Sequence, residues 1–344
     1  MKSARRTSLL ATVALVMATT APAVAGGSSP SRHLDHPSPS SASAPRLLAG
    51  GLGSGSGSTV GPDGALYVAE PVAGTIVRID PRTGATSPFA SGLPKMLPSV
   101  GLGGATDVAF RGHTAYALVT LVGPDVGGTS TAGLYRVNTR GGAHTVVADI
   151  GRWSITHPPA TAFDVPSGLQ FALQPWRGGF LVSDGHHNRI LTVTTSGAVR
   201  EVLTLGNVVP AGMDIRHGRL YFAEAGAVPH DPADGKIMAV RLGSTEPREV
   251  ASGASILTDV ELAGSGRGGR HSGALYAISN GTYSGDPAGA PGLPDTGSLI
   301  KANGSGGFDV VAADLDRPTS LEIIHRTAYV VTVDGEVWAV PLRH

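Results

Sequence analysis

Six segments of the chain align with one another without gaps, and this repeat constrains the fold more than any other feature of the sequence. The six segments are Ala65–Glu70 (ALYVAE), Thr114–Val119 (TAYALV), Gly179–Asp184 (GFLVSD), Arg219–Glu224 (RLYFAE), Ala274–Ser279 (ALYAIS) and Thr327–Thr332 (TAYVVT). Their short alternating apolar pattern is typical of β-strands. A column of five tyrosines and one leucine runs through the alignment and advances by roughly 40 to 65 residues, a spacing typical of propeller blades.

Three further strands accompany each of these segments. A shorter strand precedes each one, as in Thr106–Phe110 (TDVAF) and Ser167–Phe171 (SGLQF), and a third strand such as KIMAVRL follows. A fourth strand follows in every copy except the last, which ends with EVWAVPL. Pro45–Leu52 (PRLLAGGL) resembles the missing strand, so we expect the N-terminal strand to complete the last blade and close the ring. The sequence therefore predicts an all-β fold, a six-bladed β-propeller of four-stranded blades.

The residues before the repeat have the composition of an export signal and a linker. A basic start and an apolar run precede Ala23-Val24-Ala25, a small-residue cleavage site, while Arg5-Arg6 leaves a twin-arginine route open. We therefore expect a signal peptide at 1–25, a disordered Ser- and Pro-rich linker at 26–44 and the propeller at 45–344. This organisation predicts a secreted, extracellular protein. The propeller region contains no apolar stretch long enough to cross a bilayer, so no membrane partner is expected after cleavage.

Charge and cysteine content exclude several classes of protein. The formal net charge is +0 and the sequence shows no basic stripe, which argues against a nucleic-acid partner. The chain has no Cys, so disulfides, thiolate metal sites and a cysteine nucleophile are excluded. A chain of this length can be stabilised by burial alone, and we expect a monomer.

One stretch carries a resemblance to a known family. Gly61–Glu70 (GPDGALYVAE), with an ASGL fourth strand and an SGLQF first strand, resembles the ScyD/ScyE family of secreted bacterial propellers over essentially the whole mature chain. More loosely, the chain is similar to NHL, SMP-30/gluconolactonase and strictosidine-synthase-like propellers. Leu181–Ile190 (LVSDGHHNRI) matches the NHL-like repeat, in which an Asp, an Asn and a basic residue follow the second strand. The resemblance implies the fold and no established reaction, since propellers host many unrelated activities.

Five carboxylates are expected to share one end of the central channel. In a propeller the first strand lines the channel, and its start meets the end of the second strand at the same rim. The residues near these positions are Glu70, Asp107, Asp184, Glu224 and Asp259. Grouped carboxylates repel one another, which raises their pKa values unless a cation neutralises them, and oxygen ligands suit Ca²⁺ or Mg²⁺. The alternative is that each carboxylate accepts hydrogen bonds from strand-end amides.

The resemblance to SMP-30-like propellers bears on this predicted metal site. In those relatives a Glu near the first blade and Asn and Asp residues of later blades hold the metal. Glu70 matches the first ligand by position, and Asn188 and Asp259 are matches with no anchoring motif.

Loops supply the remaining candidates for a site. Adjacent residues of a turn point apart, so we expect His186 and His187 to be exposed at a hairpin tip rather than to share a metal. Three long insertions should lie on the same rim as the carboxylates: Ala90–Ala105, Arg152–Gly168 and Asn280–Gly297. Loops on a rigid scaffold often form binding sites, which makes Trp153, His157 and Tyr283 candidates for contacts with a small molecule or glycan.

Two functions remain open at this stage. The absence of GxSxG, HExxH and P-loop motifs favours an extracellular scaffold that binds a small molecule, glycan or protein. The alternative is a Ca²⁺- or Mg²⁺-dependent hydrolase or lactonase that acts at the acidic channel mouth, so whether the protein is an enzyme stays undecided. A quinone-dependent dehydrogenase ranks last, because no cluster of basic and aromatic residues is evident and no other cofactor is implied.

Overall fold

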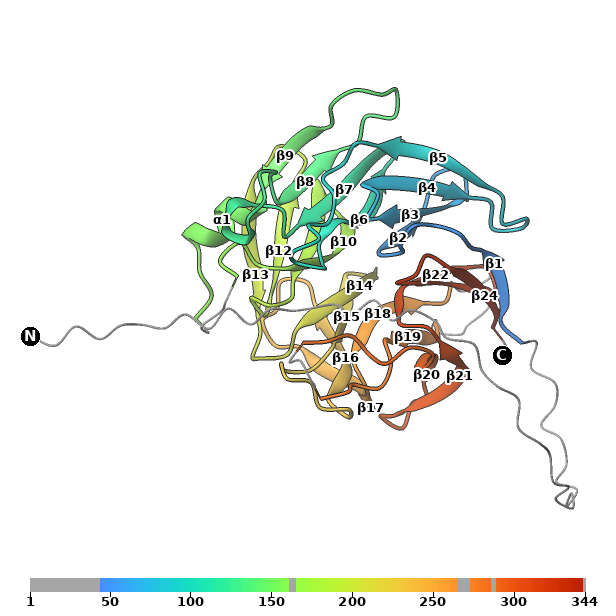
Figure 1. Ribbon diagram of the computed structural model, residues 1–344. Coiled ribbons are helices and arrows are strands. Elements are labelled where there is room, and N and C mark those ends of the chain that lie inside the picture. The colour runs from blue at the N-terminus through green and yellow to red at the C-terminus, as the bar shows by residue number, and fades with distance from the viewer. Residues whose placement is uncertain (1–43, 161–164, 265–272, 286–288, 343–344) are drawn as a thin grey trace, which may run out of the picture.

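Six four-stranded antiparallel sheets surround a central axis in the computed structural model (Figure 1). The structure describes residues 44–160, 165–264, 273–285 and 289–342. The predicted signal peptide and all but Ala44 of the predicted linker lie outside these residues. The predicted six-bladed propeller of four-stranded blades is confirmed.

Each blade consists of four consecutive strands, except that the last is completed from the N-terminus. Blade 1 contains β2 (Ser58–Val60), β3 (Leu66–Glu70), β4 (Thr75–Ile79) and β5 (Thr86–Ser91). Blade 2 contains β6 (Gly104–Arg111), β7 (Thr114–Thr120), β8 (Gly133–Arg136) and β9 (Thr145–Asp149). Blade 3 contains β10 (Gln170–Trp176), β11 (Gly179–Asp184), β12 (Arg189–Thr194) and β13 (Val199–Thr204). Blade 4 contains β14 (Pro210–Arg216), β15 (Arg219–Glu224), β16 (Gly235–Arg241) and β17 (Arg248–Ala254).

The last two blades lie between blade 4 and the start of the ring. Blade 5 contains β18 (Leu257–Leu262), β19 (Leu275–Ser279), β20 (Gly297–Ala302) and β21 (Phe308–Leu315). Blade 6 contains β22 (Pro318–Ile324), β23 (Thr327–Thr332), β24 (Val337–Pro341) and β1 (Arg46–Ala49). The described residues also include the 3-10 helix η1 (Pro124–Val126) and the helix α1 (Ile150–Thr156).

The N-terminal strand closes the ring, as the sequence predicts. β1 pairs antiparallel with β24, with Arg46 opposite Ala339 and Leu47 opposite Trp338. Figure 1 shows the two ends of the propeller side by side, with β1 in blue beside β24 in dark red. The pairing covers the edge that β24 would otherwise expose, which removes a site for unwanted strand addition.

The hydrophobic core consists of layers between neighbouring blades. Side chains alternate along each strand, so successive residues face the preceding and the following blade. In β15, Leu220 and Phe222 pack against blade 3, whereas Ala223 packs against blade 5. The repeated apolar alternation of the second strands is therefore buried on both faces.

The first strand of blade 3 differs from the prediction. We expected it at Ser167–Phe171, but β10 begins at Gln170 and pairs Leu173 with Val182. Gly168 has a φ of 76°, and a Cβ there would lie 2.3 Å from Asp184 Oδ1. This left-handed turn delays the strand, so Ala172 rather than Gly168 stands at the place that Asp107 occupies in blade 2.

The two ends of the channel have different surroundings. We call the end that carries the connections between successive blades, and between second and third strands, the loop face; the opposite end, with its short turns, is the hairpin face. Antiparallel pairing places all three long insertions on the loop face. No helix among the described residues is long and apolar enough to cross a membrane.

Candidate functional site

Glu70 anchors the start of blade 1 through both of its carboxylate oxygens. Gly53 N donates to Oε1 over 2.8 Å, and Thr75 Oγ1 donates to Oε2 over 2.5 Å. The side chain is 7 % exposed. Its place matches the alternative weighed from the sequence, in which rim carboxylates satisfy the donors of nearby strands and loops.

Asp107 and Asp259 occupy the same register position in blades 2 and 5, and each ties its blade to the next. Asp107 accepts a hydrogen bond from Val108 N and one from Leu173 N of blade 3, both over 2.7 Å. Asp259 accepts from Val260 N and from Leu321 N of blade 6, both over 2.8 Å. Each carboxylate thus uses its two oxygens to join adjacent inner strands.

Three channel carboxylates were missed from the sequence. They are Asp214, Glu261 and Glu322, which face the second-strand tyrosine column in blades 4, 5 and 6. The signal was present, because each stands two residues after the position of Asp107 in its own inner strand. Alternate residues of a strand share a face, so the pattern could have predicted them.

The channel carboxylates raise one another's pKa values. Burial is the main cause of the raised pKa of Asp259, which reaches about 7, and it holds the pKa of Asp107 well above its usual range. Burial also holds the pKa values of Glu261 and Glu322 well above the ordinary value. Negative charge adds to this effect, from Glu322 on Glu261 and from Asp259, Asp107 and Asp214 on Glu322. The channel carboxyls are therefore expected to keep their protons to a higher pH than ordinary carboxyls.

The five predicted metal ligands are not gathered at one place. Asp107 and Asp259 influence each other electrostatically, whereas Glu70, Asp184 and Glu224 end their strands in three different blades. In the described part of the chain, no three or more His, Asp or Glu side chains are arranged so that they could hold a metal ion. The metal site remains a prediction.

Calcium should leave the melting temperature unchanged, because both oxygens of Asp107 and of Asp259 already accept backbone hydrogen bonds. Differential scanning calorimetry with millimolar Ca²⁺ and with EDTA tests this expectation. A metal that binds only the folded state must raise the melting temperature. A rise with Ca²⁺ that Glu70→Gln or Asp259→Asn abolishes would support the predicted metal site instead.

Asp184 belongs to a buried ion-pair network in blade 3. Arg189 Nε donates to Asp184 Oδ2 over 2.8 Å, and the side chains are 1 % and 0 % exposed. Gln170 Nε2 donates to Asp184 Oδ1 over 2.9 Å, and His187 Nδ1 lies 3.1 Å from Oδ2. Arg189 also donates to Ser154 Oγ and to the His157 carbonyl. These contacts join the second and third strands of blade 3 to the helix α1.

The expectation that both histidines are exposed at the hairpin tip is wrong. His187 is 2 % exposed and its Nε2 lies 3.1 Å from the Val165 carbonyl, while His186 is half-buried. The cause is the insertion before β10, which folds over this turn. Asn188 does not lie in a metal site; its Oδ1 accepts from Val208 N and Val209 N, both over 2.9 Å.

The three loop candidates do not converge on one site. Trp153 stacks on His157 with ring centroids 4.3 Å apart, and the Arg189 guanidinium lies 4.9 Å from the Trp153 ring. Tyr283 lies in another blade, 9 % exposed and 5.7 Å from the ring of His230. Within the described residues, the buried Nδ1 of His230 has no hydrogen-bond partner.

Glu224 has a raised pKa at the end of β15. Burial raises the pKa of this carboxyl to about 7, against the opposing effect of the Lys236 charge across the strand pair. Burial also lowers the pKa of nearby His230, whose ring lies beside the backbone of Ala225 and Gly226. Burial therefore favours the uncharged form of both groups.

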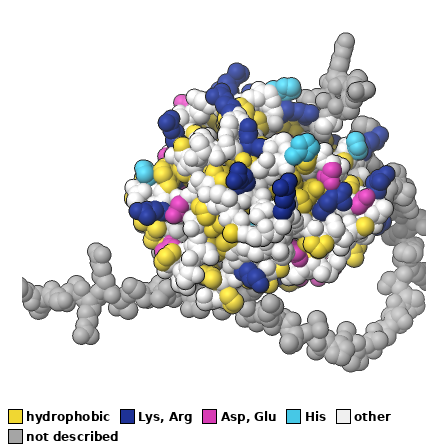
Figure 2. Space-filling model, turned by 90° about the horizontal axis from the view of Figure 1, so that it is seen from above, with side chains coloured by type: hydrophobic (Ala, Val, Ile, Leu, Met, Phe, Trp, Pro, Cys, Tyr) yellow, Lys and Arg dark blue, Asp and Glu magenta, His cyan; other side chains and the backbone are white. Residues whose placement is uncertain are grey.

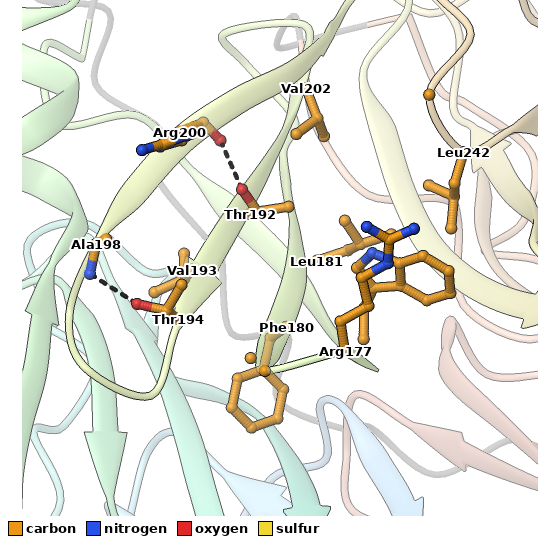
Figure 3. A pocket seen from close by; sticks show the side chains of 14 residues that line it. Arg177, Phe180, Leu181, Thr192, Val193, Thr194, Ala198, Arg200, Val202 and Leu242 are labelled. Atoms are coloured by element: carbon orange, nitrogen blue, oxygen red, sulfur yellow. Dashed lines mark hydrogen bonds between the residues drawn. The ribbon is translucent and has the colours of Figure 1, made fainter.

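A groove of about 500 Å³ opens on the hairpin face between blades 3 and 4, and we call it the blade 3–4 groove. Its lining comes from the four strands of blade 3 and one turn of blade 4: Trp176–Leu181, Thr192–Thr194, Ala198, Arg200, Val202, Leu242 and Gly243. Figure 3 shows Leu242, Leu181 and Arg177 toward one side of the view and Arg200 toward the opposite side. The groove lies on the opposite face from the predicted loop candidates.

Blade 3 lacks the repeat's tyrosine. Leu181 stands in the column that holds a tyrosine in every other blade, namely Tyr67, Tyr116, Tyr221, Tyr276 and Tyr329. In blade 1 this ring contacts Phe89 edge-on at 4.7 Å and Phe110 at 4.8 Å. Leu181 is 0 % exposed and belongs to a hydrophobic cluster against which Trp176 and Leu242 pack, so neighbouring side chains cover it in blade 3.

Each blade also carries one cation beside this column, in the third or the fourth strand. The six are Arg78, Arg136, Arg200, Arg248, Lys301 and Arg46. In blade 5, Lys301 lies 5.8 Å from the centre of the Tyr276 ring. Arg200 of blade 3 stands one strand further out, opposite Thr192, which itself pairs with Leu181.

Outside the groove, the charged and the apolar side chains of one face of the surface are dispersed. Figure 2 shows one face on which Lys and Arg side chains are dispersed and hydrophobic side chains are interspersed with polar ones. Most exposed apolar side chains of the described residues are single valines and leucines on different strands and loops. Single exposed apolar residues are normal for a soluble surface and do not indicate a docking patch.

Comparisons with known proteins place the chain among β-propellers. No family model matches the sequence, and no curated protein matches it. Solved structures do match: a PQQ-bound aldose sugar dehydrogenase from Streptomyces coelicolor has a TM-score of 0.57 and 14 % identity, with 86 % of this chain and 96 % of that chain covered. A gluconolactonase from Xanthomonas campestris has a TM-score of 0.57 and 11 % identity, with 86 % and 89 % covered.

A chain from a crystal structure of a nidogen/laminin complex is similar as well. Its TM-score is 0.52 at 14 % identity, with 78 % of this chain and 85 % of that chain covered. Identities this low show the fold alone, and the resemblance to the ScyD/ScyE family stays a prediction. The chain shares the β-propeller fold with proteins whose names describe different activities.

Proposed function

We propose that this protein is a secreted binding propeller that holds a small organic ligand in the blade 3–4 groove. The observation that carries the proposal is the groove of about 500 Å³ between blades 3 and 4, which Trp176, Val202 and Leu242 border. Sites for small molecules commonly have volumes of roughly 300–1,000 Å³ and are mostly apolar with a few polar groups. Secretion is supported by the composition of residues 1–25.

The groove has the chemical features of a binding site. Trp176 and Leu242 provide apolar surface from two blades, and they belong to one hydrophobic cluster. Arg177 and Arg200 line the same space and are exposed. A ligand that covers the apolar surface gains burial energy, while the charged groups orient it.

Narrowing the groove from blade 4 tests this proposal. We expect Leu242→Trp to weaken ligand binding at least about tenfold, since a bound ligand would lose the space it occupies. Ligand-observed NMR with a library of aromatic acids, neutral aromatics and saccharides measures binding to both proteins. The larger side chain is expected to be tolerated, because Leu242 is only half-buried.

A second variant separates blocking from misfolding. Val202 is 39 % exposed at the mouth of the groove and occupies the bulge position of its strand, where blade 1 has Phe89. Val202→Phe should therefore block the groove from outside without overpacking the core. If library compounds bind both variants as tightly as the unaltered protein, the groove is not the ligand site.

A further inference from the structure

We infer that the hairpin face carries a second binding surface, a group of arginines at the end of blade 4 that binds an acidic polysaccharide. We call Arg216, Arg219, Arg241 and Arg248 the blade 4 cluster. The inference goes beyond the proposed function and does not depend on the blade 3–4 groove. Three observations support it: the separation of charge between the two faces, the register of the arginines, and the lack of acidic partners for three of them.

The formal net charge of +0 hides a separation of charge between the two faces. Apart from the channel carboxyls, fourteen Lys and Arg residues of the described chain lie in the hairpin-face turns or at the adjoining strand ends, against six carboxylates. Two of these six, Glu201 and Glu249, form ion pairs with Arg189 and Lys236 of the loop-face ends. On the loop face the balance is reversed, with five Lys and Arg residues against twelve carboxylates. The hairpin face therefore attracts anions.

Strand pairing brings the arginines of the blade 4 cluster together. Arg216 stands opposite Arg219 in the β14–β15 pair, and Arg219 stands opposite Arg241 in the β15–β16 pair. Residues directly opposite on neighbouring strands share a face, with Cβ atoms about 4.5–5.5 Å apart. Arg248 of β17 stands opposite Ala239, two residues before Arg241, so it belongs to the same face. The four side chains therefore start from one end of one face of the blade.

This face of blade 4 is directed toward blade 5. Ile237 stands four residues before Arg241 on the same face of β16 and packs with Leu257 of blade 5. Arg216 Nη1 donates to the Ala263 carbonyl of blade 5 over 3.1 Å. The blade 3–4 groove lies on the other side of blade 4. A polymer on the cluster and a small molecule in the groove would therefore occupy different surfaces.

The cluster places like charges where they repel one another. Like charges directly opposite on neighbouring strands destabilise a sheet. The pairs equivalent to Arg219 and Arg241 are uncharged in two other blades: Gly179 with Thr194 in blade 3, and Thr327 with Pro341 in blade 6. The repeat therefore does not require arginines at this place, and a bound anion would remove the repulsion.

Three arginines of the cluster have no acidic partner among the described residues. Arg219, Arg241 and Arg248 are exposed and form no ion pair there. The turn that joins β16 to β17 contains one carboxylate, Glu246, and within the same residues it forms no ion pair either. A guanidinium can bind a carboxylate through two parallel hydrogen bonds. A polymer with regularly spaced carboxylates can therefore engage several of these groups together.

The surroundings favour a polysaccharide over a membrane or a second copy of the chain. None of the described turn residues of the hairpin face is an exposed large apolar side chain, whereas proteins that lie on membranes insert such side chains. The loop face of a second copy is a poor partner, because its Glu70, Asp184 and Glu224 are buried. An exported protein, which residues 1–25 predict, meets polysaccharides rather than nucleic acids.

A matched pair of polymers tests the requirement for charge. We expect polygalacturonate to bind at least about tenfold more tightly than its methyl ester, which has the same backbone without the charges. Biolayer interferometry with the immobilised polymers measures both affinities. The affinity for polygalacturonate should fall with added salt, because salt screens exposed charges.

Removing the exposed part of the cluster tests its location. The triple variant Arg219→Gln, Arg241→Gln, Arg248→Gln should weaken polygalacturonate binding at least about tenfold. Because the variant relieves repulsion between like charges, it should melt no lower than the unaltered protein, which circular dichroism measures. A loss of binding would then not be a loss of folding.

The matched control removes three exposed cations from the same face in blades 1, 2 and 6: Arg82→Gln, Arg140→Gln, Arg326→Gln. It should weaken binding less than about threefold, since it leaves the cluster intact. Equal losses in the two triple variants, equal binding of polygalacturonate and its ester, or no binding of polygalacturonate at low salt would overturn the inference. Tighter binding of phosphatidylglycerol vesicles or of duplex DNA at equal charge, or self-association that the cluster variant abolishes, would overturn it in favour of that partner.

Discussion

Replacing Arg189 by methionine should lower the free energy of unfolding by about 3–5 kcal/mol, because removing one partner of a buried pair leaves the other charge uncompensated. The guanidinium is 1 % exposed and bonds Asp184, Ser154 and the His157 carbonyl. Without it, Asp184 remains 0 % exposed, with Gln170 and His187 as its contacts. The cation also lies 4.9 Å from the Trp153 ring, so the contact of α1 with blade 3 weakens too.

Urea unfolding followed by circular dichroism measures this loss. Arg82→Met is the matched control, since the Arg82 side chain is 88 % exposed and lies 3.9 Å from Asp80; such surface pairs contribute roughly 0–1 kcal/mol. The double variant Arg189→Met, Asp184→Asn should recover part of the loss, because it no longer buries a lone charge. Equal midpoints for Arg189→Met and Arg82→Met would show that the buried network contributes little to stability.

The second large effect is on pH dependence: the protein should lose stability as the pH rises from about 5 to 8. Burial raises the pKa values of Asp259 and Glu224 to about 7. Burial also raises the pKa values of Asp107, Glu261 and Glu322 well above their ordinary range. In this window the folded state binds more protons than the unfolded state, so the slope of unfolding free energy against pH is negative. With about 1.4 kcal/mol for each unit, the total is on the order of several kcal/mol.

Two other titratable groups, His230 and Asp63, change the dependence of stability on pH in other ways. The pKa of His230 is lowered by burial, so its contribution is lost as the pH falls and opposes the trend of the carboxyls. The pKa of Asp63 is lowered by its hydrogen bonds and by the Arg78 charge, although its partial burial opposes the shift. Its contribution is present above pH 4 and disappears only in stronger acid.

Urea midpoints at pH 5, 6, 7 and 8 give the profile. The double variant Glu261→Gln, Glu322→Gln should flatten it and raise stability at pH 8, since amides of the same shape need no ionisation. Asp63→Asn, an exposed carboxyl on the hairpin face, should leave the slope between pH 5 and 8 unchanged. A midpoint that rises from pH 5 to 8 in the unaltered protein would contradict the raised pKa values of the channel.

Much of the fold could be predicted because the same strand pattern recurs in six copies, so a weak signal in one copy is supported by the other five. The tyrosine column and the turn before each second strand identified all six blades, and the likeness of Pro45–Leu52 to a fourth strand predicted the closure seen between β1 and β24. The one first strand that was misplaced follows a long insertion, where Gly168 turns the chain before β10. After an insertion, the position of the next strand can no longer be read from its alignment with the other copies of the repeat.

The site was harder to predict, because it depends on what faces each residue across a blade boundary. Asp107 and Asp259 were identified from the sequence, but that their oxygens bind inner-strand amides of the next blade follows only from the packing. His187 was expected in solvent and is buried, since a distant loop covers it. Such contacts between residues far apart in sequence leave no local pattern.

The sequence by itself determined the six blades, their strand order, the closure of the ring and the absence of disulfides, because these follow from periodicity and composition. It also showed that Leu181 departs from the tyrosine column, but gave that departure no meaning. Only the tertiary structure decided that a groove lies between blades 3 and 4, since its walls Trp176, Val202 and Leu242 come from separate strands and two blades. The physical reason is that empty space is a property of packing between elements, which no single strand encodes.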